Sequence, residues 1–189
     1  MNSVISDANT LQDLRSVLIL GGARSGKSRY AQKLAETSGK TPVLIATAAA
    51  GDDEMAERIE KHRAERAPHW RVVEEQIDLA GTLAHEASAD RVLVVDCLTL
   101  WLSNLMCAAK DADTAISALA AALARLDGTV IFVTNEIGLG IVPESKLGRA
   151  FRDAQGRLNQ SLAAACDTVL FIAAGLPLQL KPSAVALRL

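Results

Sequence analysis

The chain has 189 residues, of which 50% are hydrophobic and 22% charged, so it can bury a core and is neither disordered nor of low complexity. Its length indicates one domain, which we place at residues 15–189, after a poorly ordered extension at residues 1–14. The formal net charge is only −2. This excludes a protein that binds nucleic acid mainly through bulk positive charge.

We expect neither a signal peptide nor a membrane-spanning segment in this sequence. The N-terminal part contains Asp7 and Asp13 and no long apolar stretch, unlike a signal peptide, and no apolar run approaches the length of about 18 residues that crosses a bilayer. The cysteines Cys97, Cys107 and Cys166 are far apart and form no C-x-x-C pair. We therefore expect a cytoplasmic protein without membrane contact, in which all of the cysteines are buried thiols.

Short apolar runs alternate with stretches of helical spacing or composition, a pattern that predicts an α/β protein with a mostly parallel, doubly wound sheet. The predicted strands are 17–20, 43–46, 92–96, 130–134 and 169–173, and the predicted helices are 28–38, 53–66, 77–87, 114–126 and 148–165. The tail from residue 176 alternates apolar and polar residues around Pro182. It predicts an antiparallel edge addition, with Pro182 at a turn or an unpaired position.

The segment GGARSGKS carries the most specific motif of the chain. Its Gly21, Gly26, Lys27 and Ser28 satisfy G-x-x-x-x-G-K-[ST] directly after a predicted strand and before a predicted helix. The glycines allow backbone N–H groups to surround a phosphate at the positive end of the helix. We expect Lys27 to reach the β- and γ-phosphates and Ser28 to bind Mg²⁺; the alternative, an ordinary Gly-rich turn, does not account for the strand–loop–helix context.

Asp96 is the expected acidic partner of this loop. It ends the predicted strand VLVVD, and a phosphate-binding loop needs a carboxylate at the end of a neighbouring buried strand to hold the magnesium shell. The alternative is a strand-terminal aspartate that caps the next helix. The two roles are compatible.

A histidine lies on the predicted helix after the second strand. Met55, Ile59 and His62 fall on one helical stripe, so His62 faces the protein or a cleft. Arg63 and Arg66 lie within a turn of it, and such cations would keep the imidazole neutral and nucleophilic. From the pattern alone, a half-buried structural histidine is the better interpretation.

The predicted fourth strand runs into a glycine-containing loop and a helix rich in arginine. Thr134, Asn135 and Glu136 lie at the carboxyl end of that strand, where open α/β sheets bind their ligands. Arg149 and Arg152 could reach a substrate phosphate, or could equally lie on a solvated face or a subunit contact. The N-K-x-D and D-x-x-G motifs of regulatory GTPases are absent.

Several longer motifs in one order resemble a known family. GGARSGKSRYA, DDEMAERIEKHR and TNEIGLGIVPESKLGRAFRDAQGRLNQ, within residues 17–181, are similar to segments of the bifunctional adenosylcobinamide kinase/adenosylcobinamide-phosphate guanylyltransferases. The resemblance implies a P-loop NTPase fold with a RecA-like sheet, a homotrimer, and two successive reactions on one corrinoid. ATP or GTP phosphorylates adenosylcobinamide, and GTP then transfers GMP to that phosphate to give adenosylcobinamide-GDP.

The resemblance also implies the site residues. The family's second reaction runs through a guanylylated histidine that matches His62, which on this basis becomes the expected nucleophile, with Lys27 as the other catalytic residue. Arg149 and Arg152 remain candidates for the substrate phosphate, and Ser28 and Asp96 for the metal. The expected nucleotide contacts are Gly21, Gly22, Ala23, Arg24, Ser25, Gly26, Lys27, Ser28, Thr47, Ala48, Ala49, Arg63, Ala64, Glu65, Arg66, Glu74 and Asp96.

Two alternatives remain open at this point. The chain could be a single-activity small-molecule P-loop kinase in which His62 is structural, which labelling with GTP would distinguish. It could also be a RecA-like nucleotide-dependent module that handles DNA, although the net charge of −2 predicts weak binding to nucleic acid.

Overall fold

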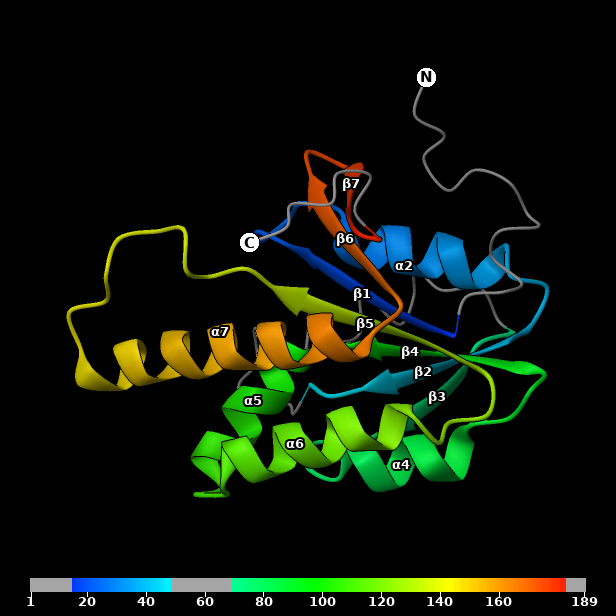
Figure 1. The fold of residues 1–189 in the computed structure, drawn as a ribbon, viewed down its shortest axis with the longest axis horizontal. Coiled ribbons are helices and arrows are strands. Elements are labelled where there is room, and N and C mark those ends of the chain that lie inside the picture. The colour runs from blue at the N-terminus through cyan, green and yellow to red at the C-terminus, as the bar shows by residue number, and fades with distance from the viewer. Residues whose placement is uncertain (1–14, 49–68, 183–189) are drawn as a thin grey trace.

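The computed structural model describes residues 15–48 and 69–182 of the chain. Figure 1 shows a central sheet with helices on both sides of it. The strands are β1 (Ser16–Gly21), β2 (Thr41–Ala46), β3 (Arg71–Glu74), β4 (Arg91–Asp96), β5 (Thr129–Asn135), β6 (Thr168–Ala173) and β7 (Leu176–Lys181). The helices are α2 (Lys27–Glu36), α4 (Leu79–Glu86), α5 (Leu98–Cys107), α6 (Ala112–Leu123) and α7 (Lys146–Ala165).

Seven strands of the described ranges form one sheet in the order β3-β2-β4-β5-β1-β6-β7. All neighbours pair in parallel except β6 and β7, which pair antiparallel. The predicted α/β class, the mostly parallel sheet and the antiparallel C-terminal edge are therefore confirmed. Pro182 directly follows the edge strand β7, so its missing N–H leaves no gap in the ladder.

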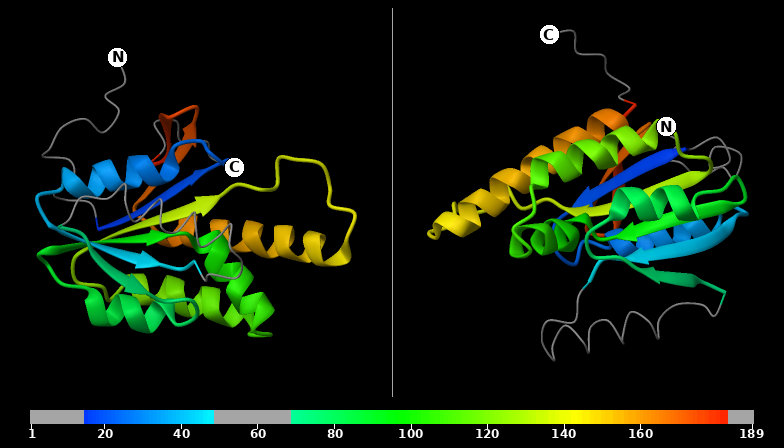
Figure 2. Two further views of the ribbon diagram at one scale, coloured as in Figure 1. Left: turned by 180° about the vertical axis from the view of Figure 1, so that it is seen from behind. Right: turned by 90° about the horizontal axis from the view of Figure 1, so that it is seen from below.

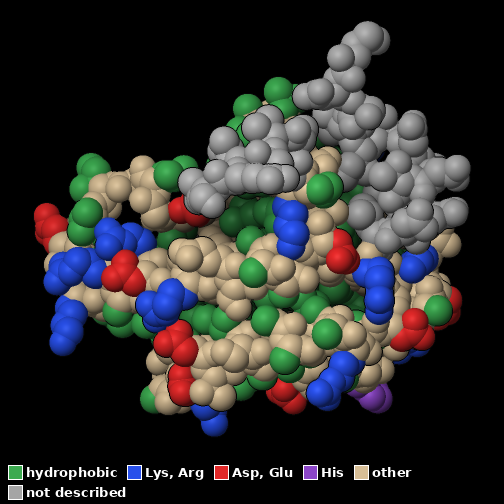
Figure 3. Space-filling model, viewed as in Figure 1, with side chains coloured by type: hydrophobic (Ala, Val, Ile, Leu, Met, Phe, Trp, Pro, Cys, Tyr) green, Lys and Arg blue, Asp and Glu red, His purple; other side chains and the backbone are tan. Residues whose placement is uncertain are grey.

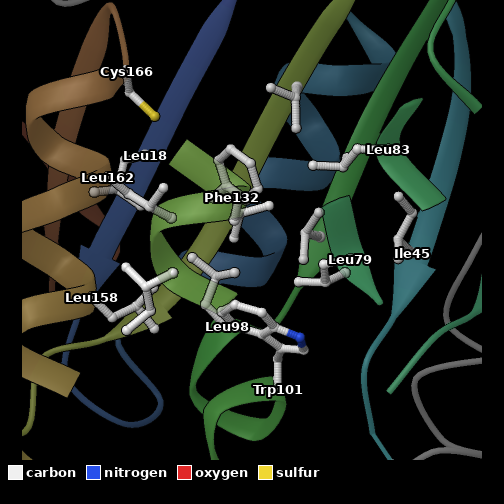
Figure 4. Packing of buried hydrophobic residues seen from close by; sticks show 14 of the residues in the cluster. Leu18, Ile45, Leu79, Leu83, Leu98, Trp101, Phe132, Leu158, Leu162 and Cys166 are labelled. Atoms are coloured by element: carbon white, nitrogen blue, oxygen red, sulfur yellow. The ribbon is translucent and has the colours of Figure 1, made fainter. Parts of the chain in front are cut away.

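Each face of the sheet has its own apolar layer, because neighbouring side chains of a buried strand point to opposite faces. On one face, Val94 and Val133 pack with Ala31 and Leu34 of α2. The other face packs against α4, α5, α6 and α7, as the views in Figure 2 show. Figure 4 shows the second layer, in which Phe132 lies among leucines from the surrounding helices and strands.

Two elements were not among the predicted ones, namely β3 and α5. The run RVVE of β3 is only four residues long, too short for periodicity to distinguish a strand from a loop. In α5 the buried residues are Leu98, Thr99, Trp101, Leu102 and Leu105, a helical spacing that was present in the sequence. The predicted helix 53–66 lies outside the described residues.

The expectation that all cysteines are buried is wrong in part. Cys166 is buried and Cys97 is partly buried, but Cys107 is exposed. It is the last residue of α5, where the helix reaches the surface. Within the described ranges, no helix has the length and apolar character needed to span a membrane.

Candidate active site

Polar residues gather at the carboxyl edge of the sheet on the face that α2 covers. Val92 and Val94 of β4 pack in the layer with α2, so the alternation of side chains places Asp96 on that face too. The same argument applies to Asn135, which follows Val133 at the same spacing. The carboxyl edge below α2 therefore carries a carboxylate and an amide.

The loop between β1 and α2, which we call the phosphate loop (residues 21–28), turns on residues in the left-handed region. Arg24 has φ 56° and Gly26 has φ 97°. The helix begins directly afterwards at Lys27, and no side chain caps it. Its first backbone N–H groups therefore point into the loop, an arrangement that favours binding of an anion.

Lys27 is folded over this loop. Its side chain is buried, with 7% of the residue exposed, and Nζ donates a hydrogen bond to the carbonyl oxygen of Gly22 at 2.6 Å. Burial and the Asp96 carboxylate raise the pKa of the Cys97 thiol, and the Lys27 ammonium offsets a small part of that rise. Lys27 of α2 and Cys97, which directly follows Asp96, therefore lie within electrostatic range of each other.

The turn between β6 and β7 braces the phosphate loop. Ala174 and Gly175 form this turn with φ of 51° and 79°, and the Gly175 N–H donates to the carbonyl oxygen of Ser25 at 2.8 Å. A Cβ atom on Gly26 would lie 3.3 Å from the Gly175 Cα. This close approach and the φ of 97° at Gly26 together favour glycine on the loop side.

Gly21 has a similar requirement at the base of the loop. A Cβ atom there would collide with the carbonyl oxygen of Ile172 and lie 2.7 Å from Ser25 Oγ. This glycine is therefore required by the packing of β1 against β6, in addition to any contact with a phosphate.

Thr47 fixes the backbone next to Asp96. Its hydroxyl donates to the carbonyl oxygen of Cys97 at 2.7 Å and accepts from the Cys97 N–H at 2.9 Å. The amide of Asn104 in turn donates to the carbonyl oxygen of Thr47 at 2.8 Å. Thr47 is fully buried, so its side chain connects β2 to β4 and α5.

Burial and the adjacent Asp96 carboxylate raise the pKa of the Cys97 thiol to about 11. The thiol is therefore neutral at physiological pH and adds no charge to the site.

Asp96 is one strand farther from the phosphate loop than the sequence suggested. β5 lies between β1 and β4, so the strand that ends in Asp96 is not the immediate neighbour of the loop's strand. The end of β5 is held on both sides: the Glu136 N–H donates to the carbonyl oxygen of Gly21 at 3.0 Å, and the Asn135 N–H donates to Thr99 Oγ1 at 2.9 Å.

The three residues expected after the fourth strand do not share one direction. Thr134 is fully buried and its hydroxyl bonds to Asn159 of α7, so it points away from α2. Asn135 lies on the α2 face, and the Glu136 carboxylate accepts a hydrogen bond from the Gly138 N–H.

Glu74, expected from the resemblance, ends β3 and lies in register with Ala46, which is itself in register with Asp96. Its neighbour Val73 packs on the other face, so Glu74 lies on the α2 face. Ala48 follows Thr47 at the same edge. The remaining expected site residues lie outside the described residues: Ala49, His62, Arg63, Ala64, Glu65 and Arg66.

Arg149 and Arg152 lie in the first half of α7, which projects beyond the sheet together with the preceding loop (Figure 1). Arg149 donates to the carbonyl oxygens of Pro143 and Glu144 at 3.0 and 2.6 Å, and Arg152 pairs with Asp153 at 2.9 Å. Both guanidinium groups are thus engaged by their own chain, away from the phosphate loop.

The space-filling view in Figure 3 shows hydrophobic side chains on the projecting loop, with basic side chains beside them. Leu139 and Ile141 are among the most exposed apolar residues, at 83% and 98%.

The sequence interpretation missed the side chains that hold this edge in place, namely Thr99, Asn104, Gln155 and Asn159. A signal was available for the last two. Gln155 and Asn159 are polar residues four apart on the apolar stripe of α7, beside Leu158 and Leu162. Polar residues on a buried helical face need partners and therefore mark a buried network.

A strand, a loop that surrounds an anion site, a buried lysine and an acidic strand end define the protein as a P-loop nucleotide-binding protein. In agreement with this, residues 17–180 match the family described as cobinamide kinase / cobinamide phosphate guanyltransferase. The chain belongs to that family, so the predicted kinase and guanylyltransferase activities are confirmed.

Curated relatives agree with this assignment. The bifunctional adenosylcobalamin biosynthesis protein CobP of Pseudomonas aeruginosa is 52% identical over 166 residues, covering 87% of this chain and 96% of the relative. The corresponding CobU of Escherichia coli is 41% identical over 180 residues, covering 87% and 99%. A solved structure from Pyrococcus horikoshii OT3 aligns with a TM-score of 0.55 at 10% identity, covering 92% of this chain and 91% of that one; it shows similarity of fold alone.

Proposed function

We propose that the chain acts in adenosylcobalamin biosynthesis by carrying out both reactions on one corrinoid, adenosylcobinamide, with the phosphate loop serving the nucleotide. In the first reaction, the hydroxyl oxygen of adenosylcobinamide attacks the γ-phosphorus of ATP or GTP. The bond from that phosphorus to the β–γ bridging oxygen breaks, the hydroxyl proton is lost, and ADP or GDP leaves. The observation that carries this proposal is the buried Lys27 folded over the loop, because its ammonium can stabilise the charge on the β- and γ-phosphates.

The second reaction uses His62. A neutral imidazole nitrogen attacks the α-phosphorus of GTP, the bond from that phosphorus to the bridging oxygen breaks, and pyrophosphate leaves. A phosphate oxygen of adenosylcobinamide phosphate then attacks the same phosphorus, the phosphorus–nitrogen bond breaks, and adenosylcobinamide-GDP leaves with the histidine restored. The support is the family assignment and the arginines next to His62 in the sequence, which favour its neutral form.

Magnesium fits the groups at the carboxyl edge. Within residues 15–48 and 69–182, no three His, Cys, Asp or Glu side chains gather into a metal site, and Mg²⁺ bound with a nucleotide does not need such a cage. It is usually held by one or two protein oxygens together with phosphates and water. The Ser28 hydroxyl and the Asp96 carboxylate would supply those oxygens, and the ion, when bound, neutralises charge on the phosphates.

The other expected contacts complete the proposal. The backbone of the phosphate loop would surround the phosphates. The rest of the nucleotide would be contacted by Glu74, by residues 47–49 after β2 and by residues 63–66 after His62. Arg149 and Arg152 would meet the corrinoid phosphate across a subunit boundary, because the half of α7 that carries them projects away from the phosphate loop of the same chain (Figure 1). This is consistent with the homotrimer that the family resemblance implies.

Labelling with GTP tests the histidine assignment. The protein is incubated with GTP that is radioactive at the α-phosphate, and acid-labile label on the protein is counted. We expect full labelling of the wild type, reduced labelling of Lys27→Ala and no labelling of His62→Ala. His85→Ala serves as a matched control and should label normally. Label on His62→Ala would exclude this residue as the nucleophile.

Phosphorylation of cobinamide by ATP tests the loop assignment separately. Lys27→Ala should lower kcat by about 100-fold or more, the scale seen when one group that stabilises transition-state charge is removed. His62→Ala should retain this first activity. Full kinase activity in Lys27→Ala would refute the role of the phosphate loop.

A further inference from the structure

Three polar side chains lie buried between α7 and the end of β5. Thr134 and Gln155 are 0% exposed and Asn159 is 6% exposed. Gln155 Nε2 donates to Thr134 Oγ1 and to Asn159 Oδ1, both at 2.9 Å, and Thr134 Oγ1 donates to Asn159 Oδ1 at 2.8 Å. We call these three residues the α7 polar cluster.

We expect the fold to form without the polar groups of this cluster. Its neighbours on α7, Ala154, Leu158 and Leu162, are apolar and pack in the main core. Within the described part of the chain, the buried Gln155 Oε1 has no hydrogen-bond partner, and an unpaired buried acceptor is destabilising. Apolar side chains of similar volume would serve the packing at least as well.

The cluster does, however, hold one backbone group at the carboxyl edge of the sheet. Asn159 Nδ2 donates to the carbonyl oxygen of Asn135 at 3.1 Å. The N–H of the same residue donates to Thr99 in the first turn of α5, and the next N–H, of Glu136, donates to Gly21 at the base of the phosphate loop. The end of β5 is thus tied to three elements at once.

This position lies between the two parts of the proposed site. β5 separates β1, which leads into the phosphate loop, from β4, which ends in Asp96. A displacement of the end of β5 therefore changes the spacing between the loop and Asp96. Rate is sensitive to such spacing, since a misplacement of about 1 Å can lower it by about 100-fold.

We propose that Gln155 and Asn159 are positioning residues for phosphoryl transfer: through the Asn135 backbone they fix the spacing between the phosphate loop and the Asp96 strand. The inference rests on the proposed function of the loop and of Asp96. It predicts a fall in kcat without a matching loss of nucleotide affinity, because the loop's own contacts to the nucleotide stay intact.

The experiment uses the full chain and measures three quantities: kcat of cobinamide phosphorylation, the Kd for ADP, and the thermal unfolding midpoint. The main variants are Asn159→Leu and the triple replacement Thr134→Val, Gln155→Met and Asn159→Leu, which exchanges all three polar groups for apolar ones together. Gln160→Leu is the matched control, because Gln160 lies on the exposed side of α7.

We expect both main variants to lose about 10- to 100-fold in kcat, with the Kd for ADP within about threefold of the wild type. The triple variant leaves the Asn135 carbonyl without its Asn159 donor, which costs about 1–3 kcal/mol, so it should unfold a few degrees below the wild type and still be folded at the assay temperature. A folded triple variant with wild-type kcat would overturn the proposal, and so would a loss of kcat that only follows a loss of folded protein.

If Asn159→Leu does not fold, the triple variant decides the question, and Gln155→Met, which removes only donors and the unpaired acceptor, provides a second test by the same criteria. A wild-type chain that does not phosphorylate cobinamide at all would instead refute the proposed function, independently of the cluster.

Discussion

Replacing Thr47 by valine removes the hydroxyl that connects the ends of β2 and β4 while keeping the shape of the side chain. The Cys97 N–H then loses its acceptor at 2.9 Å and the Cys97 carbonyl loses its donor at 2.7 Å. The carbonyl still accepts from the Trp101 N–H at 3.2 Å, so only the N–H is left without its partner.

The expected loss of stability follows from these two lost hydrogen bonds. An orphaned buried donor costs about 1–3 kcal/mol and the lost bond to the carbonyl about 1 kcal/mol, so we expect Thr47→Val to lose roughly 2–4 kcal/mol of unfolding free energy. For a chain of this length, that corresponds to a fall in Tm of about 4–16 °C. Thr47→Ser keeps the hydroxyl and removes one methyl, which costs about 1 kcal/mol.

Urea unfolding followed by circular dichroism measures both variants, and cobinamide phosphorylation measures the effect on the site. Because Thr47 braces the backbone next to Asp96, kcat should fall in the valine variant and stay near the wild-type value in the serine variant. A valine variant that is as stable as the serine variant, or more so, would show that this hydroxyl does not hold the edge together.

Two further predictions concern the loop and the thiols. Gly26 has φ 97°, a conformation that costs a residue with an L side chain about 1–2 kcal/mol. Gly26→Ala should therefore lower the free energy of unfolding by that amount and weaken ADP binding. The control is Gly156→Ala, in the open middle of α7, which should leave ADP binding unchanged and leave stability unchanged or slightly higher. In the folded protein at pH 8, a thiol-specific disulfide reagent should modify Cys107 alone. Burial raises the pKa of Cys97 to about 11 and that of Cys166 to about 12. Both therefore stay protonated and unreactive until the pH approaches those values. Rapid reaction of more than one thiol, or of any thiol in Cys107→Ser, would contradict this.

The fold class could be predicted because its signals are local. Each buried strand is a continuous apolar run, and the strand–loop–helix motif lies within a few residues of Gly21. The order of the strands could not be predicted in the same way, since it depends on contacts between segments far apart in the chain. The position of β5 between the loop's strand and the Asp96 strand is such a contact.

The site residues divide along the same line. Lys27 and Asp96 could be proposed from the sequence because a motif or a strand end marks them. The roles of Thr47 and Asn159 could not, because each acts through a hydrogen bond to a backbone group more than twenty residues away, Cys97 in one case and Asn135 in the other. A side chain that acts on a site only through another residue's backbone belongs to no sequence motif that would reveal it.

The turn at Ala174 and Gly175 braces a loop that precedes it by nearly the whole length of the chain. During synthesis, residues 21–28 leave the ribosome early, but β5 and β6, the two strands that flank β1, and the bracing turn emerge only in the last third of the chain. The nascent chain therefore carries the complete phosphate-binding motif for most of its synthesis without this brace. We expect a chain that ends before Ala174 to keep the motif and to bind nucleotide more weakly, because the Ser25 carbonyl lacks the Gly175 N–H.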